Sequence, residues 1–254
     1  MQERLTQMRD LAIKTLEEFG IKEIQPSSYA SQLLMDAANI DGDSWERDLV
    51  EQDNPSGEGK VQLRTILMPS MLESLGKEYA ANQKSVRAYE IAKTYTKNYV
   101  IPGAAPFECW NLSVGLYGEE EDLSTIAEVI TAVLEKMGIA DVEFFVETEY
   151  ATYNPEKCAR IVTKDYSGQF VELGIMGEFH PSVKENFAID APAYGAELFF
   201  DLIAEFADRA HQYHEAITQP LASLDAEILA AESAQLDELE RQIKAVFGVV
   251  NHES

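Results

Sequence analysis

Three histidines in this sequence have neighbours with which they could do chemistry. His211 and His214 lie three residues apart with Glu215 beside them, a spacing that could give a helix a metal-binding face. The sequence places no third ligand near them, so an exposed acidic helix is the favoured interpretation. His180 precedes Pro181 and could act as a base, but a turn histidine that bonds to backbone groups is the simpler interpretation.

Two further features have both a structural and a functional interpretation. Gly174 and Gly177 are too sparse to cradle a phosphate, and inside a strand pattern they indicate close backbone packing. Arg64 lies between Leu63 and Ile66, a setting that favours partial burial in an ion pair fixing the loop over contact with a ligand. We therefore treat Arg64 as a framework residue.

The acidic composition limits the partners that this chain can bind directly. It has 45 acidic and 20 basic residues and a formal net charge of −25, so phosphate backbones repel it. No apolar run approaches the roughly 20 residues needed to span a bilayer, and the first residues do not resemble a signal peptide. We expect a cytoplasmic protein with no membrane contact.

The two cysteines, Cys109 and Cys158, give neither a disulfide framework nor the spacing of a metal site. We expect both to be small buried side chains in a reducing compartment.

The N-terminal part is predicted to form a helix, a strand and a second helix. Residues 2–19 carry one apolar stripe at helical spacing, and Gly20 is placed to end that helix. A short strand over 21–25 ends at Pro26, and residues 29–40 again have helical spacing.

The stretch from 53 to 95 organises the predicted fold. A turn at 54–57 precedes apolar residues at helical spacing, with Pro69 near the start, where the first turn of a helix tolerates it. Residues 86–91 then alternate apolar and charged side chains, as a half-buried strand does.

The rest of the chain is predicted to alternate strands and helices. The expected strands cover 110–117, 142–146, 160–162, 171–179 and 194–202, and the expected helices cover 123–137 and 205–219. Pro220 interrupts the second of these helices, and 221–246 again shows near-helical apolar spacing. Residues 205–254 are therefore expected to form a helical tail.

These segments resemble the beta subunit of bacterial phenylalanine-tRNA ligase, also called phenylalanyl-tRNA synthetase. The family pattern Asn-Pro, Leu-Arg-x-Ser-Leu-Leu-Pro-x-Leu-Leu, then Leu-Phe-Glu-Ile-Gly is matched by Asn54-Pro55, Leu63-Arg64-Thr65, Leu67-Met68-Pro69, Met71-Leu72 and Tyr89-Glu90-Ile91-Ala92. A second family block, Gly-x-x-Gly-Glu-Leu-His-Pro, is matched from Gly174 to Pro181. Ala92 stands where the family has Gly, and Asn154 where it usually has His. The resemblance covers about residues 1–204.

The resemblance implies where a partner subunit packs. In class II aminoacyl-tRNA synthetases a helix, a Gly, a strand and a Pro form motif 1, which makes the subunit interface. Residues 2–26 resemble this element, and the interface residues it implies are Leu16, Phe19, Gly20, Ile24 and Pro26.

The resemblance also implies that this chain alone is not catalytic. Motif 2 of class II enzymes usually reads Arg-x-Glu, whereas Arg87 and Glu90 lie one residue further apart, which places them on opposite faces of a strand. At the motif 3 position, residues 195–201 have no Gly repeat, and their two Phe and two acidic residues would fill or repel an ATP site. We expect no cofactor on this chain, with ATP and Mg²⁺ bound by the catalytic alpha subunit.

The predicted fold is α+β: a class II synthetase-like core with an antiparallel sheet of about six or seven strands flanked by helices. Residues 1–204 would form this core and 205–254 the tail, with Arg64, Pro69 and Glu90 as framework. The implied function is that of a non-catalytic beta-subunit core that assembles with the alpha subunit and reaches tRNA only through the full complex. The alternatives are a free-standing, self-associating (homodimeric) interaction or regulatory module and, more weakly, an enzyme with altered small-molecule activation.

Overall fold

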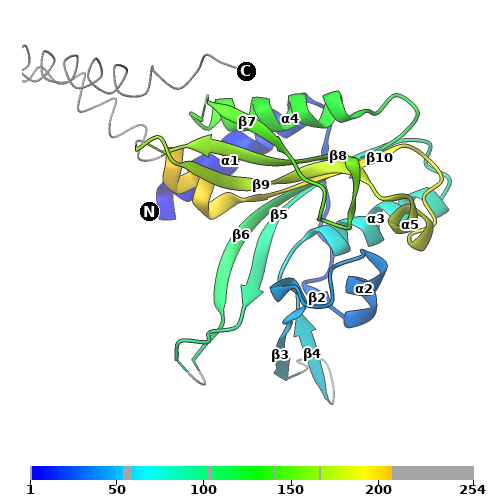
Figure 1. Ribbon diagram of the computed structural model, residues 1–254, viewed down its shortest axis with the longest axis horizontal. Coiled ribbons are helices and arrows are strands. Elements are labelled where there is room, and N and C mark those ends of the chain that lie inside the picture. Colours follow the sequence, from blue (N-terminus) through cyan, green and yellow to red (C-terminus); the bar gives the residue numbers. More distant parts are fainter. Residues whose placement is uncertain (1, 54–58, 102–103, 140, 166, 208–254) are drawn as a thin grey trace, which may run out of the picture. The chain divides into compact units, whose positions relative to one another are not determined.

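The centre of the fold is a seven-stranded sheet with the order β1-β5-β6-β10-β9-β8-β7 (Figure 1). The computed structural model describes residues 2–53, 59–101, 104–139, 141–165 and 167–207. The strands of the sheet are β1 (Lys22–Glu23), β5 (Val86–Thr96), β6 (Phe107–Tyr117), β7 (Val142–Val146), β8 (Tyr153–Lys164), β9 (Phe170–Phe179) and β10 (Ala193–Phe199). All neighbours pair antiparallel except β1 and β5, which are parallel. The predicted α+β fold with a mainly antiparallel sheet is confirmed.

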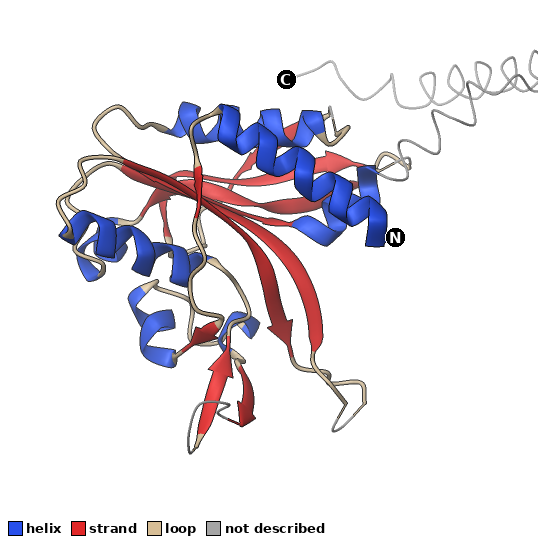
Figure 2. Cartoon of the chain, turned by 180° about the vertical axis from the view of Figure 1, so that it is seen from behind, coloured by secondary structure: helices blue, strands red, loops and turns tan. Residues whose placement is uncertain are grey.

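Helices cover both faces of this sheet (Figures 1 and 2). Helices α1 (Gln2–Glu18) and α4 (Leu123–Lys136) pack on one face, and α3 (Met68–Ala80) packs on the other, with α2 (Gln32–Ala37) and α5 (Pro181–Asn186) on the same side as α3. Two hydrophobic cores result, one on each face of the sheet.

Strand β6 shows how the alternation of side chains builds these two cores. Leu112, Val114 and Leu116 are fully buried in the core under α1 and α4. At Gly115 the side-chain position faces α3 on the other face of the sheet, and a Cβ atom there would lie 2.8 Å from the Met71 side chain. The absence of a side chain therefore lets α3 approach the sheet closely.

A small second sheet, β2-β4-β3, was not predicted. It contains β2 (Tyr29–Ala30), β3 (Val50–Asp53) and β4 (Lys60–Leu63), and a 3-10 helix at Trp45–Arg47 leads into β3. The predicted helix over 29–40 is too long, because Tyr29 pairs with Leu63 and the Ser31 side chain caps the helix by accepting from the Leu34 N–H.

Other expectations need small corrections. The strand expected over 21–25 is limited to β1, and the strand expected over 194–202 ends at Phe199, because residues 200–207 are helical. Cys158 is buried as expected, but Cys109 is exposed. The turn at 54–57, His211, His214, Glu215 and nearly all of the expected tail lie outside the described residues, so the division at residue 204 stays a prediction.

The described part of the chain lacks two kinds of feature. None of its helices is long and apolar enough to cross a membrane. It also contains no cluster of three or more His, Cys, Asp or Glu side chains suited to a metal ion.

Candidate functional site

Helix α1 ends in a Schellman motif at Gly20. Gly20 has a φ of 73°, its N–H donates to the Glu17 carbonyl at 2.9 Å, and the Ile21 N–H donates to the Leu16 carbonyl at 3.0 Å. Leu16 and Ile21 are 0% and 1% exposed in the same core. The Leu16 side chain therefore lies in the core and has no exposed surface with which to contact a partner, so its predicted place can only be near the interface.

The other four predicted interface residues keep exposed surface. Gly20 is exposed, and Phe19, Ile24 and Pro26 are half-buried. Strand β1 lies at one edge of the sheet, and the Ile24 N–H donates to a β5 carbonyl at 2.8 Å. The outer side of β1 pairs with no strand in the described part of the chain. We call Phe19, Gly20, Ile24 and Pro26 the α1–β1 surface; their contact with a partner stays a prediction.

Arg64 and Glu90 form a buried, two-pronged ion pair beside the α1–β1 surface. Arg64 Nη2 lies 2.6 Å from Glu90 Oε1, and Nη1 lies 3.1 Å from Oε2. The two side chains are only 2% and 4% exposed. Burial raises the pKa of the Glu90 carboxyl, while the Arg64 hydrogen bonds lower it. The ion pair predicted for Arg64 is thus present, with Glu90 as its partner.

Further contacts of Arg64 hold the segment that follows Pro26. Its Nη1 donates to the Ser27 carbonyl at 3.2 Å, and its backbone N–H donates to the Ser28 carbonyl at 3.1 Å. The Tyr95 N–H of β5 donates to the Arg64 carbonyl at 2.9 Å. Arg64 therefore joins the end of β4, strand β5 and the end of the α1–β1 surface, as a framework residue would.

Arg87 lies on the other face of β5, as its spacing from Glu90 predicts. Its Nε donates to Glu121 at 2.8 Å and its Nη1 to the Phe19 carbonyl at 3.3 Å. Arg87 therefore fixes the end of α1, and it shares no partner with Glu90.

Helix α3 begins at Met68 and Pro69, as predicted, but its N-terminus is capped from a distant strand. Glu197 of β10 accepts from the backbone N–H groups of Leu67 and Met68, both at 2.8 Å, and from Asn111 Nδ2 at 2.9 Å. A carboxylate at this end of a helix also interacts favourably with the helix dipole. Glu197 thus ties α3 to the middle of the sheet.

The burial of the Glu197 carboxyl is unfavourable for its charged form. Burial raises the pKa of its carboxyl to about 7, because the three hydrogen bonds offset only part of the desolvation and the Glu46 charge adds to it.

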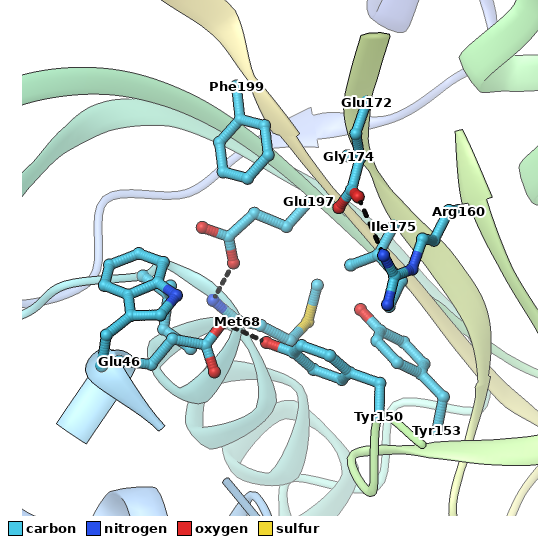
Figure 3. A pocket seen from close by; sticks show the side chains of 12 residues that line it. Glu46, Met68, Tyr150, Tyr153, Arg160, Glu172, Gly174, Ile175, Glu197 and Phe199 are labelled. Atoms are coloured by element: carbon cyan, nitrogen blue, oxygen red, sulfur yellow. Dashed lines mark hydrogen bonds and ion pairs between the residues drawn. The ribbon is translucent and has the colours of Figure 1, made fainter. Parts of the chain in front are cut away.

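Glu197 also lies in a cleft of about 180 Å³ (Figure 3). The cleft is lined by Trp45, Glu46, Ile66, Met68, Tyr150, Tyr153, Arg160, Glu172, Gly174, Ile175, Glu197 and Phe199. Of the two Phe and two acidic residues expected to block an ATP site, only Glu197 and Phe199 lie here. Phe200 is buried in the opposite core, and Asp201 accepts from the Trp110 N–H at 2.8 Å.

The charge of this cleft does not suit phosphate groups. Its lining contains three glutamates and one arginine. Arg160 is already paired with Glu147 and with Glu172, the latter at 3.3 Å. Adenylate chemistry requires cations that stabilise phosphate charge, and this lining has an excess of carboxylates instead. The residues present do not fit an ATP site.

His180 and the two glycines have structural roles. The His180 ring accepts from the Ser182 N–H at 3.2 Å and caps α5, which is the role expected of a turn histidine. A Cβ atom at Gly174 would lie 2.2 Å from the Glu197 carbonyl oxygen, and one at Gly177 would lie 2.7 Å from the Lys157 carbonyl oxygen. Both glycines therefore allow close backbone packing, as predicted.

Comparison with known families identifies related sequences. A family model described as "Phenylalanyl tRNA synthetase beta chain CLM domain" matches residues 1–200. The phenylalanine-tRNA ligase beta subunit of Clostridium acetobutylicum is 29% identical over 247 residues, 97% of this chain and 30% of that protein. That of Clostridium tetani is 28% identical over 248 residues, 96% of this chain and 30% of that protein. The chain thus spans about 30% of the length of these relatives.

Two consequences follow for the sequence-based expectations. The similarity to both clostridial proteins continues past residue 204, so the expectation that the resemblance ends there is wrong for these relatives. A solved structure of pyrrolysyl-tRNA synthetase from Desulfitobacterium hafniense matches with a TM-score of 0.61 and 19% identity, over 87% of this chain and 74% of that chain. A second structure of that enzyme matches with a TM-score of 0.63. At this identity the likeness shows the fold alone, and it confirms the predicted class II synthetase-like core.

Proposed function

The chain belongs to the family of the phenylalanyl-tRNA synthetase beta chain CLM domain, and from this membership we propose that it is the non-catalytic core of a phenylalanine-tRNA ligase beta subunit. In this role it assembles with the catalytic alpha subunit, which binds ATP and Mg²⁺ and attaches phenylalanine to tRNA. The tRNA is reached only through the full complex, and the complex works in the cytoplasm.

The observation that carries the non-catalytic part of this proposal is the charge of the cleft. Glu46, Glu172 and Glu197 outnumber the single Arg160, which is itself paired with carboxylates. A site of this kind repels the triphosphate of ATP. The chain therefore contributes to the reaction by supporting another subunit.

The α1–β1 surface supports the assembly part of the proposal. Arg87 holds the Phe19 carbonyl at one end of this surface, and Arg64 holds the Ser27 carbonyl just past its other end. A surface fixed in this way loses little conformational freedom on binding, which favours affinity. The exposed charged side chains of Lys22 and Glu23 on β1 disfavour unspecific pairing of another strand with this edge.

Charge introduced into the α1–β1 surface is expected to weaken assembly. Phe19→Asp combined with Ile24→Asp places two carboxylates where an apolar contact is proposed, and loss of such a contact typically costs about 2 kcal/mol, or roughly 30-fold in affinity. The affinity for the alpha subunit of the same organism is measured by calorimetry, after circular dichroism has shown that the variant is folded.

Val146→Asp is the matched control for this experiment. Val146 is 80% exposed and lies on β7, at the opposite edge of the sheet from β1. The Val146→Asp variant should bind the alpha subunit with the same affinity as the unmodified chain. Equal affinity of the double variant and the unmodified chain would remove Phe19 and Ile24 from the interface.

A further inference from the structure

Tyr153 has a polar group that the proposed function leaves unexplained. The residue is 1% exposed, and its hydroxyl has no hydrogen-bond partner within the described part of the chain. Its ring is held by Phe179, at a centroid distance of 5.6 Å and an interplanar angle of 14°, and by Tyr150, at 5.8 Å. Figure 3 shows the hydroxyl directed into the cleft, toward the space between Met68 and Arg160. Buried hydroxyls are nearly always hydrogen-bonded, so this one indicates a missing partner.

Two buried carboxylates face the same cleft. Glu46 and Glu197 are 8% and 7% exposed. Glu46 accepts from the Tyr150 hydroxyl at 2.6 Å, and Glu197 accepts from the N-terminus of α3, so hydrogen bonds hold both in place. Burial raises the pKa of each carboxyl, and the hydrogen bonds that each accepts offset only part of this effect.

The one cation of the lining cannot balance these charges. Arg160 is half exposed and bonds to Glu147 and Glu172. Above about pH 7, where Glu197 has lost its proton, a cationic ligand would therefore relieve an uncompensated negative charge, whereas an anionic ligand would add to it. A bare metal ion is disfavoured, since the described residues contain no group of three metal-binding side chains.

The remaining walls are apolar, and the cleft is small. Ile66, Met68, Ile175 and Phe199 contribute apolar surface, and Trp45 adds an aromatic face that is 55% exposed. The volume of about 180 Å³ is below the roughly 300 to 1,000 Å³ of pockets for drug-sized ligands. A ligand that fits must therefore combine a cationic head with a short apolar body.

We propose that this cleft binds a small organic cation, an ammonium group on a short apolar chain, with the ammonium group among Glu46, Glu197 and Tyr153. The Tyr153 hydroxyl oxygen accepts a hydrogen bond from the ammonium group, which supplies its missing partner. The apolar chain lies against Ile175 and Phe199, and aromatic faces add cation–π attraction. The residues of the α1–β1 surface do not line this cleft. Binding of the cation can therefore be tested independently of assembly with the alpha subunit.

The test is a titration of the full chain with 3-methylbutylamine at pH 8, where Glu197 is ionised, and at constant ionic strength, followed by ¹H–¹⁵N spectra. Trp45 lines the cleft and Trp110 does not, so the indole signal of Trp45 should shift and saturate while that of Trp110 stays in place. The anion 4-methylpentanoate, which has the same apolar chain, should shift neither signal. No saturable shift with the amine, or an equal shift with the anion, would overturn the proposal.

Two variants with matched controls localise the binding. Tyr153→Phe should weaken amine binding at least about 5-fold, and Tyr117→Phe, whose hydroxyl donates to the Gln83 carbonyl outside the cleft, should not change it. Glu172→Gln, at a half-exposed position, should weaken it about 3-fold, unlike Glu143→Gln on β7. If Tyr153→Phe and Glu172→Gln both bind the amine as tightly as the unmodified chain, the proposal is wrong.

Discussion

Replacing Arg64 by Met will lower the free energy of unfolding by about 3 to 5 kcal/mol. The substitution leaves the Glu90 carboxyl in a site where its side chain is only 4% exposed, without the guanidinium that bonds both of its oxygens. It also removes the bond from Nη1 to the Ser27 carbonyl. Urea unfolding monitored by circular dichroism measures the change.

The exposed pair of Lys77 and Glu73 provides the control for this prediction. Their side chains are 70% and 47% exposed, so Lys77→Met should cost no more than about 0.5 kcal/mol. The double variant Arg64→Met with Glu90→Leu should be more stable than Arg64→Met alone, because it leaves no buried charge. An Arg64→Met variant within about 1 kcal/mol of the unmodified chain would contradict the framework role.

The stability of the chain will fall by about 3 kcal/mol through Glu197 alone as the pH rises from about 4.5 to above 7. The folded chain holds the proton of Glu197 up to about pH 7, whereas the unfolded chain releases it near the ordinary value of 4.5. Between these values the folded state binds more protons, so the free energy of unfolding decreases as the pH rises. The contribution is fully present below pH 4.5 and is lost as the pH passes 7.

Unfolding at pH 5 and at pH 8 measures this effect, with Glu197→Gln as the comparison. The variant has no titrating group here, so its stability should change less between the two pH values. The loss of one acceptor oxygen affects both pH values alike and leaves that difference unchanged. A ¹³C titration of the Glu197 carboxyl should give a midpoint near 7, and a midpoint at or below 4.5 would refute the prediction.

Local signals in the sequence were sufficient to predict most of the large elements. The stripe of α1 with Gly20 behind it, Pro69 at the start of α3 and the alternation along β5 each depend on neighbours within a few residues. The burial of Leu16 could not be predicted in this way. An apolar side chain on a helix stripe has the same pattern whether it faces its own core or a partner.

The contacts that build the cleft are long-range, and for that reason the sequence did not reveal them. Glu197 accepts a hydrogen bond from the N–H of Leu67, which is 130 residues away, and Glu46 accepts one from the hydroxyl of Tyr150, which is 104 residues away. The short strands β2, β3 and β4 are stabilised by one another across loops, with little alternation of their own. Arg64 was recognised because a charged residue between apolar neighbours implies a buried partner, although its partner Glu90 could not be assigned from spacing.

The most direct test of the proposed role is the mass in solution, measured by light scattering for the chain alone and mixed with the alpha subunit of the same organism. If the chain is a beta-subunit core, the mixture will contain a stable complex whose mass includes both chains. A homodimer whose mass is unaffected by the alpha subunit would contradict this role and would favour a self-associating module.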